Sequence, residues 1–398
     1  MSVAGSGLDT ALPAAADLLD PARAAEVLAA AAEGASLGPV AVRYLRWKPG
    51  TNLVVRYDVE VDGLATTASA YIRTGGGLGG WAADLGHQRL AAAAAAHAAV
   101  PSPLAHVAAT DVLVQWFPLD LRLPALAQGA VTVAQRAGVG PAGRTDVELL
   151  AYKPRRRAVQ RVGEVVVKVH AAAANAQRAA LAARLAARAL GRQAPEPVGA
   201  CTEDRSTAQA WVSGRPIERL GLVDEVRELL VRLHAASPRG LHEAGVGSQL
   251  VQAPQTATLV VTAVPRLADT VERLLSRLGA EAPPDQRHVL CHGDLSADQL
   301  IISPQHGLVL LDHDEAVAGP PALDWASFAT ASVQSVADLE PARATLAVLA
   351  PMLNPAQGRW WMATALLRRA AFPLRSASPG WPDLLAARVA AAAAALQP

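Results

Sequence analysis

The chain of 398 residues has few cysteines, few aromatic residues and few charges of either sign. Cys201 and Cys291 are its only cysteines, too few for a disulfide framework or a four-cysteine zinc site, and they suggest a reducing compartment. The 36 Lys and Arg residues nearly balance the 35 Asp and Glu residues, so the formal net charge of +1 is too small to attract nucleic acid or an anionic membrane. We therefore expect neither as a partner.

Long apolar runs are also absent. The alanine runs 91–96 and 391–395 are too short to cross a bilayer, and arginines interrupt the longest alanine-rich stretch. The N-terminus has no basic segment and carries Asp9, Asp17 and Asp20, which is not the pattern of a signal peptide. The sequence therefore predicts a cytoplasmic protein.

The usual nucleotide and metal motifs G-x-x-x-x-G-K-[ST] and H-E-x-x-H do not occur. The segment 75–80 satisfies G-x-G-x-x-G, but the acidic residue expected about 20 positions later is missing. We interpret this segment as a glycine-rich turn.

The first half of the chain contains an internal repeat. Its first copy begins at Tyr44-Leu-Arg-Trp-Lys-Pro, and its second copy begins at Leu149-Leu-Ala-Tyr-Lys-Pro. Each copy continues through strand-like segments and an alanine-rich helix, near 82–99 and over 171–190, to a tryptophan. An offset of 95 residues aligns Arg73 with Lys168, and Trp116 with Trp211. The sequence predicts two strand-strand-strand-helix-strand units in tandem.

The remainder of the chain is predicted to be mostly helical. Outside the repeat, the apolar spacing predicts helices over 13–34, 222–235, 267–278, 335–350, 356–371 and 382–396, with a short β region over 300–302 and 308–311.

The segment from His292 to Gln299, His-Gly-Asp-Leu-Ser-Ala-Asp-Gln, is the most informative part of the sequence. With the strand and the acidic pair that follow, it reads H-x-D-x-x-x-x-Q, strand, D-x-D, an arrangement that suits phosphoryl transfer. Asp294 could orient or deprotonate an attacking hydroxyl, although a lone Asp in a loop is often solvated or capping. A buried His292 could brace the loop by hydrogen bonding.

The acidic pair Asp312-His-Asp314 begins thirteen residues after Gln299. Gln299 and Asp312 offer the hard oxygen ligands that Mg²⁺ prefers, although Gln299 could simply form hydrogen bonds at a strand start. Asp312 follows four apolar residues, so we expect it to be buried and to need a partner charge. Asp314 is either a second ligand or an exposed neighbour. Asp324 is expected to cap the following helix and hold the loop.

Basic residues in the second repeat copy are candidates for binding phosphate. Lys168 ends a run of valines, where a lysine is disfavoured unless it meets an anion such as an ATP phosphate. The alternative is a lysine on an edge strand that reaches water. Arg155 and Arg157, in the turn after Lys153-Pro, could bind phosphate in bidentate fashion or could form a solvated turn.

In these residues the chain resembles the aminoglycoside phosphotransferase-like kinases, a family that shares the protein-kinase fold and phosphorylates small-molecule hydroxyls. Val166-Val-Lys168 resembles the strand of the ATP-binding lysine. Leu230-Val-Arg-Leu-His234 resembles the family's Leu-His helix. Residues 292–324 resemble its catalytic loop, metal aspartate and G-x-P-x-x-D segment.

The resemblance implies a role for each matching residue, and ATP and Mg²⁺ as cofactors. Asp294 would be the catalytic base beside His292, Lys168 would bind phosphate, and Gln299 and Asp312 would be the metal ligands. The hinge beside adenine would contain Gln209, Trp211 and Val212.

The resemblance also implies an α+β, bilobal, protein-kinase-like fold with a mostly helical C-lobe. The extra repeat and the Gln at position 299 resemble maltokinase-like relatives, which carry an additional N-terminal domain built like part of a kinase N-lobe. We expect a helical lead-in over 1–38, this duplicated N-lobe-like unit as a cap over 39–140, a nucleotide-binding N-lobe over 141–217 and a catalytic C-lobe over 218–398.

Two departures from the family pattern bear on activity. Helix 171–190 contains no Asp or Glu, so the usual glutamate partner of the lysine is missing. Gln299 stands where Asn is usual. Either departure could mean altered metal geometry or a protein that binds nucleotide without transferring phosphate.

The function expected first is ATP- and Mg²⁺-dependent transfer of a phosphoryl group to a hydroxyl of a sugar, cyclitol or related metabolite. The alternatives are a Ser/Thr kinase for a peptide natural-product precursor and a catalytically silent kinase fold with a binding role. A homo-dimer or a partner protein is compatible with each.

Residues 355–398 contain Asp383 as their one acidic residue, which weakens the hypothesis of an aminoglycoside acceptor. Tryptophans at 325, 360, 361 and 381 could stack on a sugar or pack in the core.

Overall fold

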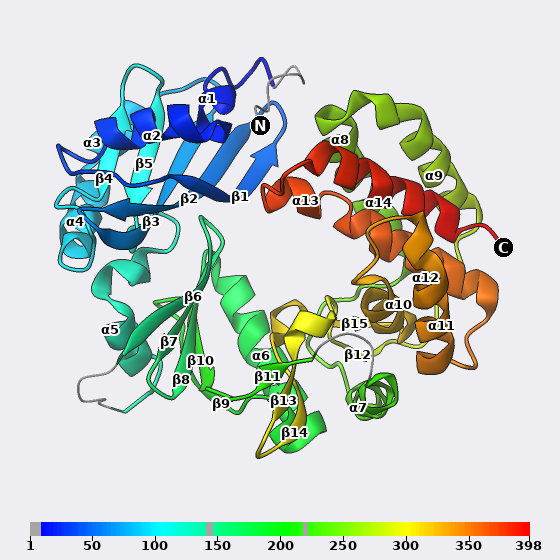
Figure 1. Ribbon diagram of the computed structural model, residues 1–398. Helices are drawn as coiled ribbons and strands as arrows, with labels where there is room; N and C mark the ends of the chain where they lie inside the picture. Colours follow the sequence, from blue (N-terminus) through cyan, green and yellow to red (C-terminus); the bar gives the residue numbers. More distant parts are fainter. Residues whose placement is uncertain (1–8, 141–145, 218–221) are drawn as a thin grey trace. The chain divides into compact units, whose positions relative to one another are not determined.

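The computed structural model describes residues 9–140, 146–217 and 222–398, which form two compact units (Figure 1). The first unit comprises the described residues up to Ala176 together with Gly199–Ala208 and Leu374–Pro379. The second comprises Gln177–Val198, the described residues of Gln209–Pro373, and Gly380–Pro398. The predicted domain boundaries at 140/141 and 217/218 adjoin 141–145 and 218–221, which lie outside the described residues.

The first unit contains two five-stranded sheets of the same topology, β1-β2-β3-β5-β4 and β6-β7-β8-β10-β9. The first sheet consists of β1 (Ala41–Lys48), β2 (Asn52–Val61), β3 (Leu64–Arg73), β4 (Leu104–Val107) and β5 (Val112–Trp116). The second consists of β6 (Val147–Lys153), β7 (Arg157–Val162), β8 (Val165–His170), β9 (Pro197–Cys201) and β10 (Ser206–Ala210). The predicted duplication is therefore confirmed.

Helices cover both faces of the first sheet. Successive side chains of a strand point to opposite faces, and the strands of this sheet have buried side chains on each face. On one face, next to α1 (Ala15–Leu19) and α2 (Pro21–Ala30), Tyr57 donates a hydrogen bond to the Leu18 carbonyl, with 2.7 Å between the two oxygens. On the other face, Val54 and Tyr71 pack with α3 (Leu78–Ala83) and α4 (Leu85–Ala95). The 3₁₀ helix η1 (Pro124–Gln128) and α5 (Ala130–Arg136) pack on the second sheet.

The strand register corrects the predicted alignment of the two copies. Val54 pairs with Tyr71 as Val159 pairs with Lys168, and Lys48 pairs with Asn52 as Lys153 pairs with Arg157. Tyr71, rather than Arg73, is therefore the counterpart of Lys168. A single offset of 95 residues aligns the two copies incorrectly, because their hairpins differ in length. The strands β2 and β3 have 10 residues each, whereas β7 and β8 have 6 each.

The predicted equivalence of Trp116 and Trp211 is also wrong. The Trp116 amide donates to the Pro103 carbonyl at the start of β4, as the Ala210 amide donates to the Glu196 carbonyl at the start of β9. Ala210 is thus the counterpart of Trp116. Trp211 lies beyond β10, where it is half-buried.

The second unit is mostly helical. Its helices are α7 (Val223–Ala235), α8 (Val246–Ala263), α9 (Ala268–Ala280), α10 (Ala322–Thr330), α11 (Leu339–Leu349), α12 (Pro355–Arg369) and α14 (Trp381–Ala395), with most of α6 (Ala173–Leu190) and the start of α13 (Phe372–Arg375). Its short strands are β11 (Arg215–Pro216), β12 (Val289–Cys291), β13 (Leu300–Ser303), β14 (Gly307–Leu310) and β15 (Val317–Gly319).

Helix starts in this unit follow from local sequence. Asn354 accepts a hydrogen bond from the Ala356 amide, and Pro355 stands in the first turn, so α12 begins where a cap and a proline favour it. The helix α8 was not predicted, because Pro254 interrupts the helical pattern within it. Within the described ranges, no helix has the length and the apolar composition that a membrane crossing requires.

Candidate active site

The loop from His292 to Gln299 follows the buried strand β12, which pairs with β15. It ends in the 3₁₀ turn Ala297–Gln299, from which β13 starts, and β13 forms a hairpin with β14. Asp294 is half-exposed in this loop, whereas His292 and Gly293 are buried. The local sequence therefore presents the Asp294 carboxylate from a loop whose ends are anchored in sheet structure.

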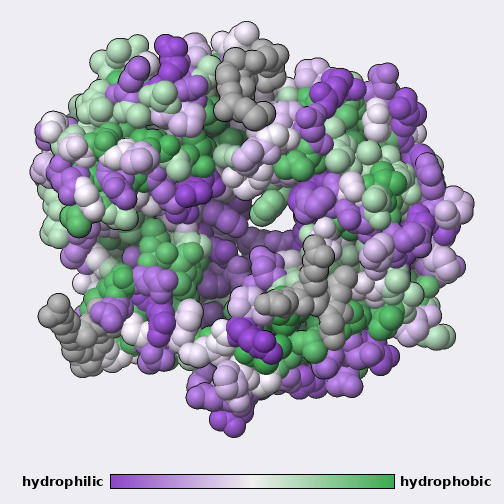
Figure 2. All heavy atoms as spheres, in the orientation of Figure 1, coloured by the Kyte–Doolittle hydropathy of each residue, from purple (hydrophilic) through white to green (hydrophobic). Residues whose placement is uncertain are grey.

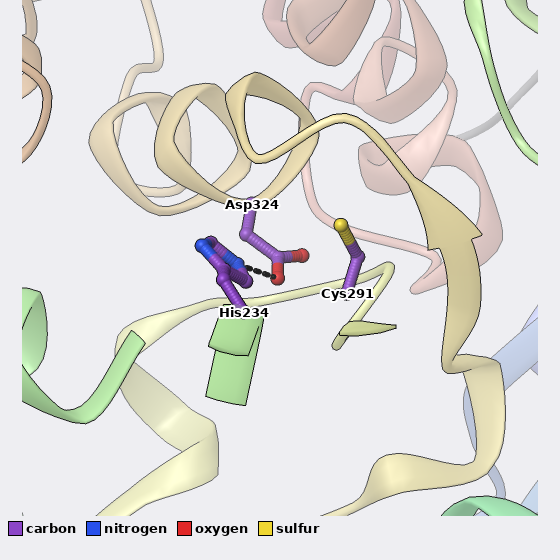
Figure 3. A group of neighbouring side chains, drawn as sticks. All are labelled: His234, Cys291 and Asp324. Carbon is purple, nitrogen blue, oxygen red and sulfur yellow. Dashed lines mark hydrogen bonds and ion pairs between the residues drawn. The ribbon is translucent and has the colours of Figure 1, made fainter. Parts of the chain in front are cut away.

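Asp324 holds this loop from α10 (Figure 3). It is fully buried, and its carboxylate accepts hydrogen bonds from the backbone amides of His292 at 2.8 Å and Gly293 at 2.9 Å. The expectation that Asp324 holds the loop is correct. The expectation that it caps the following helix is wrong, because its oxygens are directed to the two amides that precede Asp294.

His234 at the end of α7 completes this arrangement. Its Nε2 lies 3.0 Å from the Asp324 carboxylate, and its ring packs edge-on against Trp325. Burial alone would raise the pKa of Asp324. The hydrogen bond and charge of His234, the charge of His292 and the Gly293 amide together lower that pKa below its usual value. Asp324 is therefore held as a carboxylate.

Cys291 lies beside His234 and Asp324, and the three side chains converge as zinc ligands would (Figure 3). The thiol, however, donates hydrogen bonds to the carbonyls of Gly319 and Pro320, with 3.2 and 3.4 Å between the atoms. Burial raises the pKa of the thiol, which opposes the thiolate that a metal requires. We interpret the three residues as a hydrogen-bonded cluster rather than a metal centre.

His292 braces the loop, as its sequence position suggested. Its Nε2 lies 2.8 Å from the Leu311 carbonyl, directly before Asp312. Its ring stacks edge-on against His313, with 5.3 Å between the ring centroids. One imidazole therefore connects the loop of Asp294 to the segment of the acidic pair.

Two arginines at the end of α12 contact the loop and were not predicted. Arg369 Nη2 lies 3.2 Å from the Asp294 carboxylate and 2.9 Å from the Leu295 carbonyl. Arg368 donates to the Gly293 carbonyl at 3.1 Å, and burial lowers the pKa of its guanidinium. Both arginines also reach the Ser327 hydroxyl at 3.1 Å. Asp294 is thus bordered by two positive charges.

The predicted metal ligands lie at strand ends. Gln299 accepts a hydrogen bond from the Ser296 amide at 3.0 Å through its side-chain oxygen, which retains a second lone pair. Asp312 follows β14 in the left-handed region at φ 55° and is half-buried rather than buried. Asp314 is buried, so the exposed-neighbour alternative is wrong for it. This donor set consists of oxygens alone and fits Mg²⁺.

Lys168 and the expected hinge residues lie away from the loop in the sequence. Lys168 is 4% exposed on β8, an interior strand of the second sheet, so the alternative of a lysine on an edge strand that reaches water is wrong. Gln209 lies on β10, and Trp211 and Val212 follow it. The chain passes from the first unit to the second between Ala208 and Gln209.

The turn of Arg155 and Arg157 joins β6 to β7. The guanidinium of Arg155 lies over the ring of Tyr71 in the first sheet, 4.1 Å from its centroid. The alternative of a solvated turn is therefore wrong for Arg155. Arg157 begins β7 and is half-buried.

The tryptophans of the second unit divide into two kinds. Trp360 and Trp361 are each 1% exposed in the core of this unit, so core packing holds for them. Trp325 and Trp381 are half-buried.

Comparisons with known proteins identify the family of the chain. Residues 152–361 match the model of the phosphotransferase enzyme family, APH. This match spans more than half of the chain, and the chain belongs to that family. Family membership and the observed architecture confirm the predicted kinase-like, α+β fold class. No protein among the curated sequences compared matches the chain.

Solved structures with a similar fold are distant in sequence. A choline/ethanolamine kinase family protein from Mesorhizobium loti is 16% identical, with a TM-score of 0.48 over 67% of this chain and 93% of that chain. A macrolide 2'-phosphotransferase from Brachybacterium faecium is 19% identical, with a TM-score of 0.42 over 67% and 96%. The GDP complex of aminoglycoside 2'-phosphotransferase-IIIa is 14% identical, with a TM-score of 0.48 over 66% and 97%.

Proposed function

We propose that this protein transfers the γ-phosphoryl group of ATP to a hydroxyl of a sugar, cyclitol or related small metabolite. The observation that carries the proposal is the pair of hydrogen bonds that the His292 and Gly293 amides donate to the Asp324 carboxylate. These bonds fix the backbone immediately before Asp294 and leave its carboxylate half-exposed for an acceptor. Fixed positioning is the main contribution of the protein in phosphoryl transfer.

The roles of the remaining residues follow from their chemistry. Gln299 and Asp312 would hold Mg²⁺, with Asp314 beside them, and the ion would supply positive charge against the phosphates. Lys168 would bind phosphate, as the family resemblance implies. Gln209, Trp211 and Val212 would lie beside adenine.

In the reaction, the acceptor oxygen forms a bond to the γ-phosphorus while the bond from that phosphorus to the β–γ bridging oxygen breaks. ADP leaves with that oxygen. Asp294 accepts the hydrogen bond of the attacking hydroxyl and receives its proton. Arg369 holds the Asp294 carboxylate in position through its contact of 3.2 Å.

The charges around Asp294 favour a neutral acceptor over a cationic one. Arg368 and Arg369 lie 3.9 and 3.2 Å from the Asp294 carboxylate. A polycationic aminoglycoside that brought its hydroxyl to Asp294 would approach both guanidinium groups, and like charges at short range repel. A sugar or a cyclitol would not meet this repulsion.

Calorimetry of ATP binding, with and without Mg²⁺, is the first test. We expect binding that depends on Mg²⁺ and that is lost in Asp312→Ala. Exposed Asp298 in the same loop provides the matched control, Asp298→Ala, which should bind as wild type does. A screen of sugar, cyclitol and peptide hydroxyls for ADP release then identifies the acceptor, and Asp294→Asn should abolish that release. Absence of nucleotide binding by the wild type would refute the proposal.

A catalytically silent fold is the second candidate, because α6 departs from the family pattern in containing no acidic residue. It predicts that ATP binds normally and that no acceptor, including water, yields ADP. The same screen therefore separates the two functions.

A further inference from the structure

The turns that join the first two strands of each sheet are held in the same way. Asp9 accepts a hydrogen bond from the Gly50 amide at 2.5 Å, and Asp120 accepts one from the Arg155 amide at 2.6 Å. Asp120 is buried and also accepts from the Tyr152 hydroxyl at 3.0 Å. Gly50 and Arg155 are therefore equivalent positions, each anchored by an aspartate.

The two positions share a backbone conformation that favours glycine. Gly50 has φ 66° and Arg155 has φ 61°, in the left-handed region where a Cβ is strained. The first copy uses glycine there, whereas the second uses arginine. A residue kept in a strained conformation often serves a function, so the side chain of Arg155 requires an explanation.

That side chain lies over aromatic rings of the first sheet. Its guanidinium carbon is 4.1 Å from the centroid of Tyr71 and 5.6 Å from that of Trp81, and these two rings stack on each other. Nη1 of Arg155 is buried, and it has no hydrogen-bond partner among the residues that the structure describes. Tyr71 is the counterpart of Lys168, so Arg155 brings a positive charge to the place in the first sheet where the second sheet has its lysine.

Further arginines surround Arg155. Burial and the charges of Arg156, Arg375 and Arg155 lower the pKa of Arg46, and Arg122 acts in the same direction on Arg155. Within the described part of the chain, none of Arg46, Arg122, Arg155 and Arg156 forms an ion pair with a carboxylate. The buried carboxylate of Asp120 acts on Arg155 together with Tyr71 and Tyr152, and this carboxylate is engaged by backbone and tyrosine donors.

Figure 2 shows hydrophilic side chains gathered in the first unit where the β6–β7 turn meets the first sheet. Arginines without acidic partners repel one another, and a bound anion would relieve that repulsion. Arginine is also the side chain best suited to bind phosphate or carboxylate in bidentate fashion.

We propose that the β6–β7 turn and the first sheet form a binding site for a small multivalent anion, held by Arg46, Arg155 and Arg156 with Arg122 nearby. The ligand carries at least two phosphate or carboxylate charges. The site differs from the nucleotide site of the proposed function, because it uses the first sheet and not Lys168.

Calorimetry in buffer containing EDTA, with inorganic tripolyphosphate, citrate and acetate as probes, tests this site. The variant is Arg46→Gln/Arg156→Gln. The matched control is Arg43→Gln/Arg89→Gln, which removes the same charge from exposed positions of the first unit. Lys168→Met reports on the nucleotide site.

We expect tripolyphosphate or citrate to bind the wild type, and acetate to bind at least tenfold more weakly. The Arg46→Gln/Arg156→Gln variant should weaken the binding at least tenfold, and the control and Lys168→Met should each stay within twofold of wild type. Whether tripolyphosphate or citrate binds more tightly identifies phosphate or carboxylate as the natural group. Failure of both anions to bind the wild type overturns the proposal, and so does a loss that follows Lys168→Met instead of the arginine variant.

Thermal stability provides a second measurement. Without anion, Arg46→Gln/Arg156→Gln should melt at or above the temperature of the wild type, because like charges have been removed. Tripolyphosphate should raise the melting temperature of the wild type and not that of the variant. If the arginines had only a structural role, the variant would melt below the wild type with or without anion.

Discussion

Replacement of Asp324 by asparagine tests whether this carboxylate fixes the loop from His292 to Gln299. The side chain keeps its shape in Asp324→Asn, but one acceptor oxygen becomes an NH₂ group. If the remaining oxygen keeps the His292 amide and His234, the NH₂ group faces the Gly293 amide, and two donors oppose each other. The Gly293 bond is then lost.

The size of the effect follows from these three hydrogen bonds. A hydrogen bond to a charged group contributes about 1.5–3 kcal/mol, and a neutral bond contributes about half as much. Loss of one charged bond and weakening of two others by half should destabilise the protein by about 3–6 kcal/mol, a range that includes the cost of about 3–5 kcal/mol for breaking a buried charge pair. Because Asp324 is fully buried, solvent screening does not reduce this value.

Urea unfolding followed by circular dichroism measures the difference in free energy. Hydrogen exchange of the His292 and Gly293 amides measures the local effect, and their protection should decrease in Asp324→Asn. Asp298→Asn, at an exposed carboxylate of the same loop, serves as the control and should change stability by less than about 0.5 kcal/mol. If the two variants have equal stability and equal amide protection, Asp324 does not hold the loop.

Three further predictions follow. The pKa of Asp324 is lower in the folded protein than the usual value near 4 of an unfolded chain. Its carboxylate therefore stabilises the fold above about pH 4, and this contribution is lost as the pH falls through the folded pKa. The difference in urea stability between wild type and Asp324→Asn should therefore shrink below about pH 4, and growth of the difference would contradict the assignment. Arg369→Ala should lower kcat with the best acceptor at least tenfold with little change in the KM for ATP, whereas Arg369→Lys should recover part of kcat. Equal kcat values for the two variants would show that the cation does not position Asp294. Burial raises the pKa of Cys291, so mass spectrometry should detect little iodoacetamide labelling of this thiol in the native protein and full labelling in urea. Rapid native labelling would indicate an open site.

The sequence was sufficient to predict the duplicated sheets and the loop around Asp294, because both depend on local patterns. Alternating strands, an alanine-rich helix and repeated Lys-Pro turns identify the two copies. The alignment within the copies was wrong, because a one-dimensional offset cannot show that one hairpin is four residues longer on each strand.

The cations beside Asp294 could not be predicted from the loop. Arg369 lies 75 residues after Asp294, on a helix whose other face is core, and tertiary packing brings the two together. One signal existed, since the loop from His292 to Gln299 contains no Lys or Arg of its own. The direction in which the Asp324 carboxylate points also depends on tertiary packing, because its position in the sequence was equally suitable for capping a helix.

The tyrosine that replaces the lysine in the first sheet has a consequence for stoichiometry. Two sheets of the same strand order suggest two nucleotides per chain, but a lysine at this position occurs in the second sheet alone. We therefore expect a titration with ATP to end at one nucleotide per chain. Because the first sheet has tyrosine at this position, we expect substitutions around Tyr71 to leave nucleotide binding unchanged, whereas substitutions around Lys168 should weaken it.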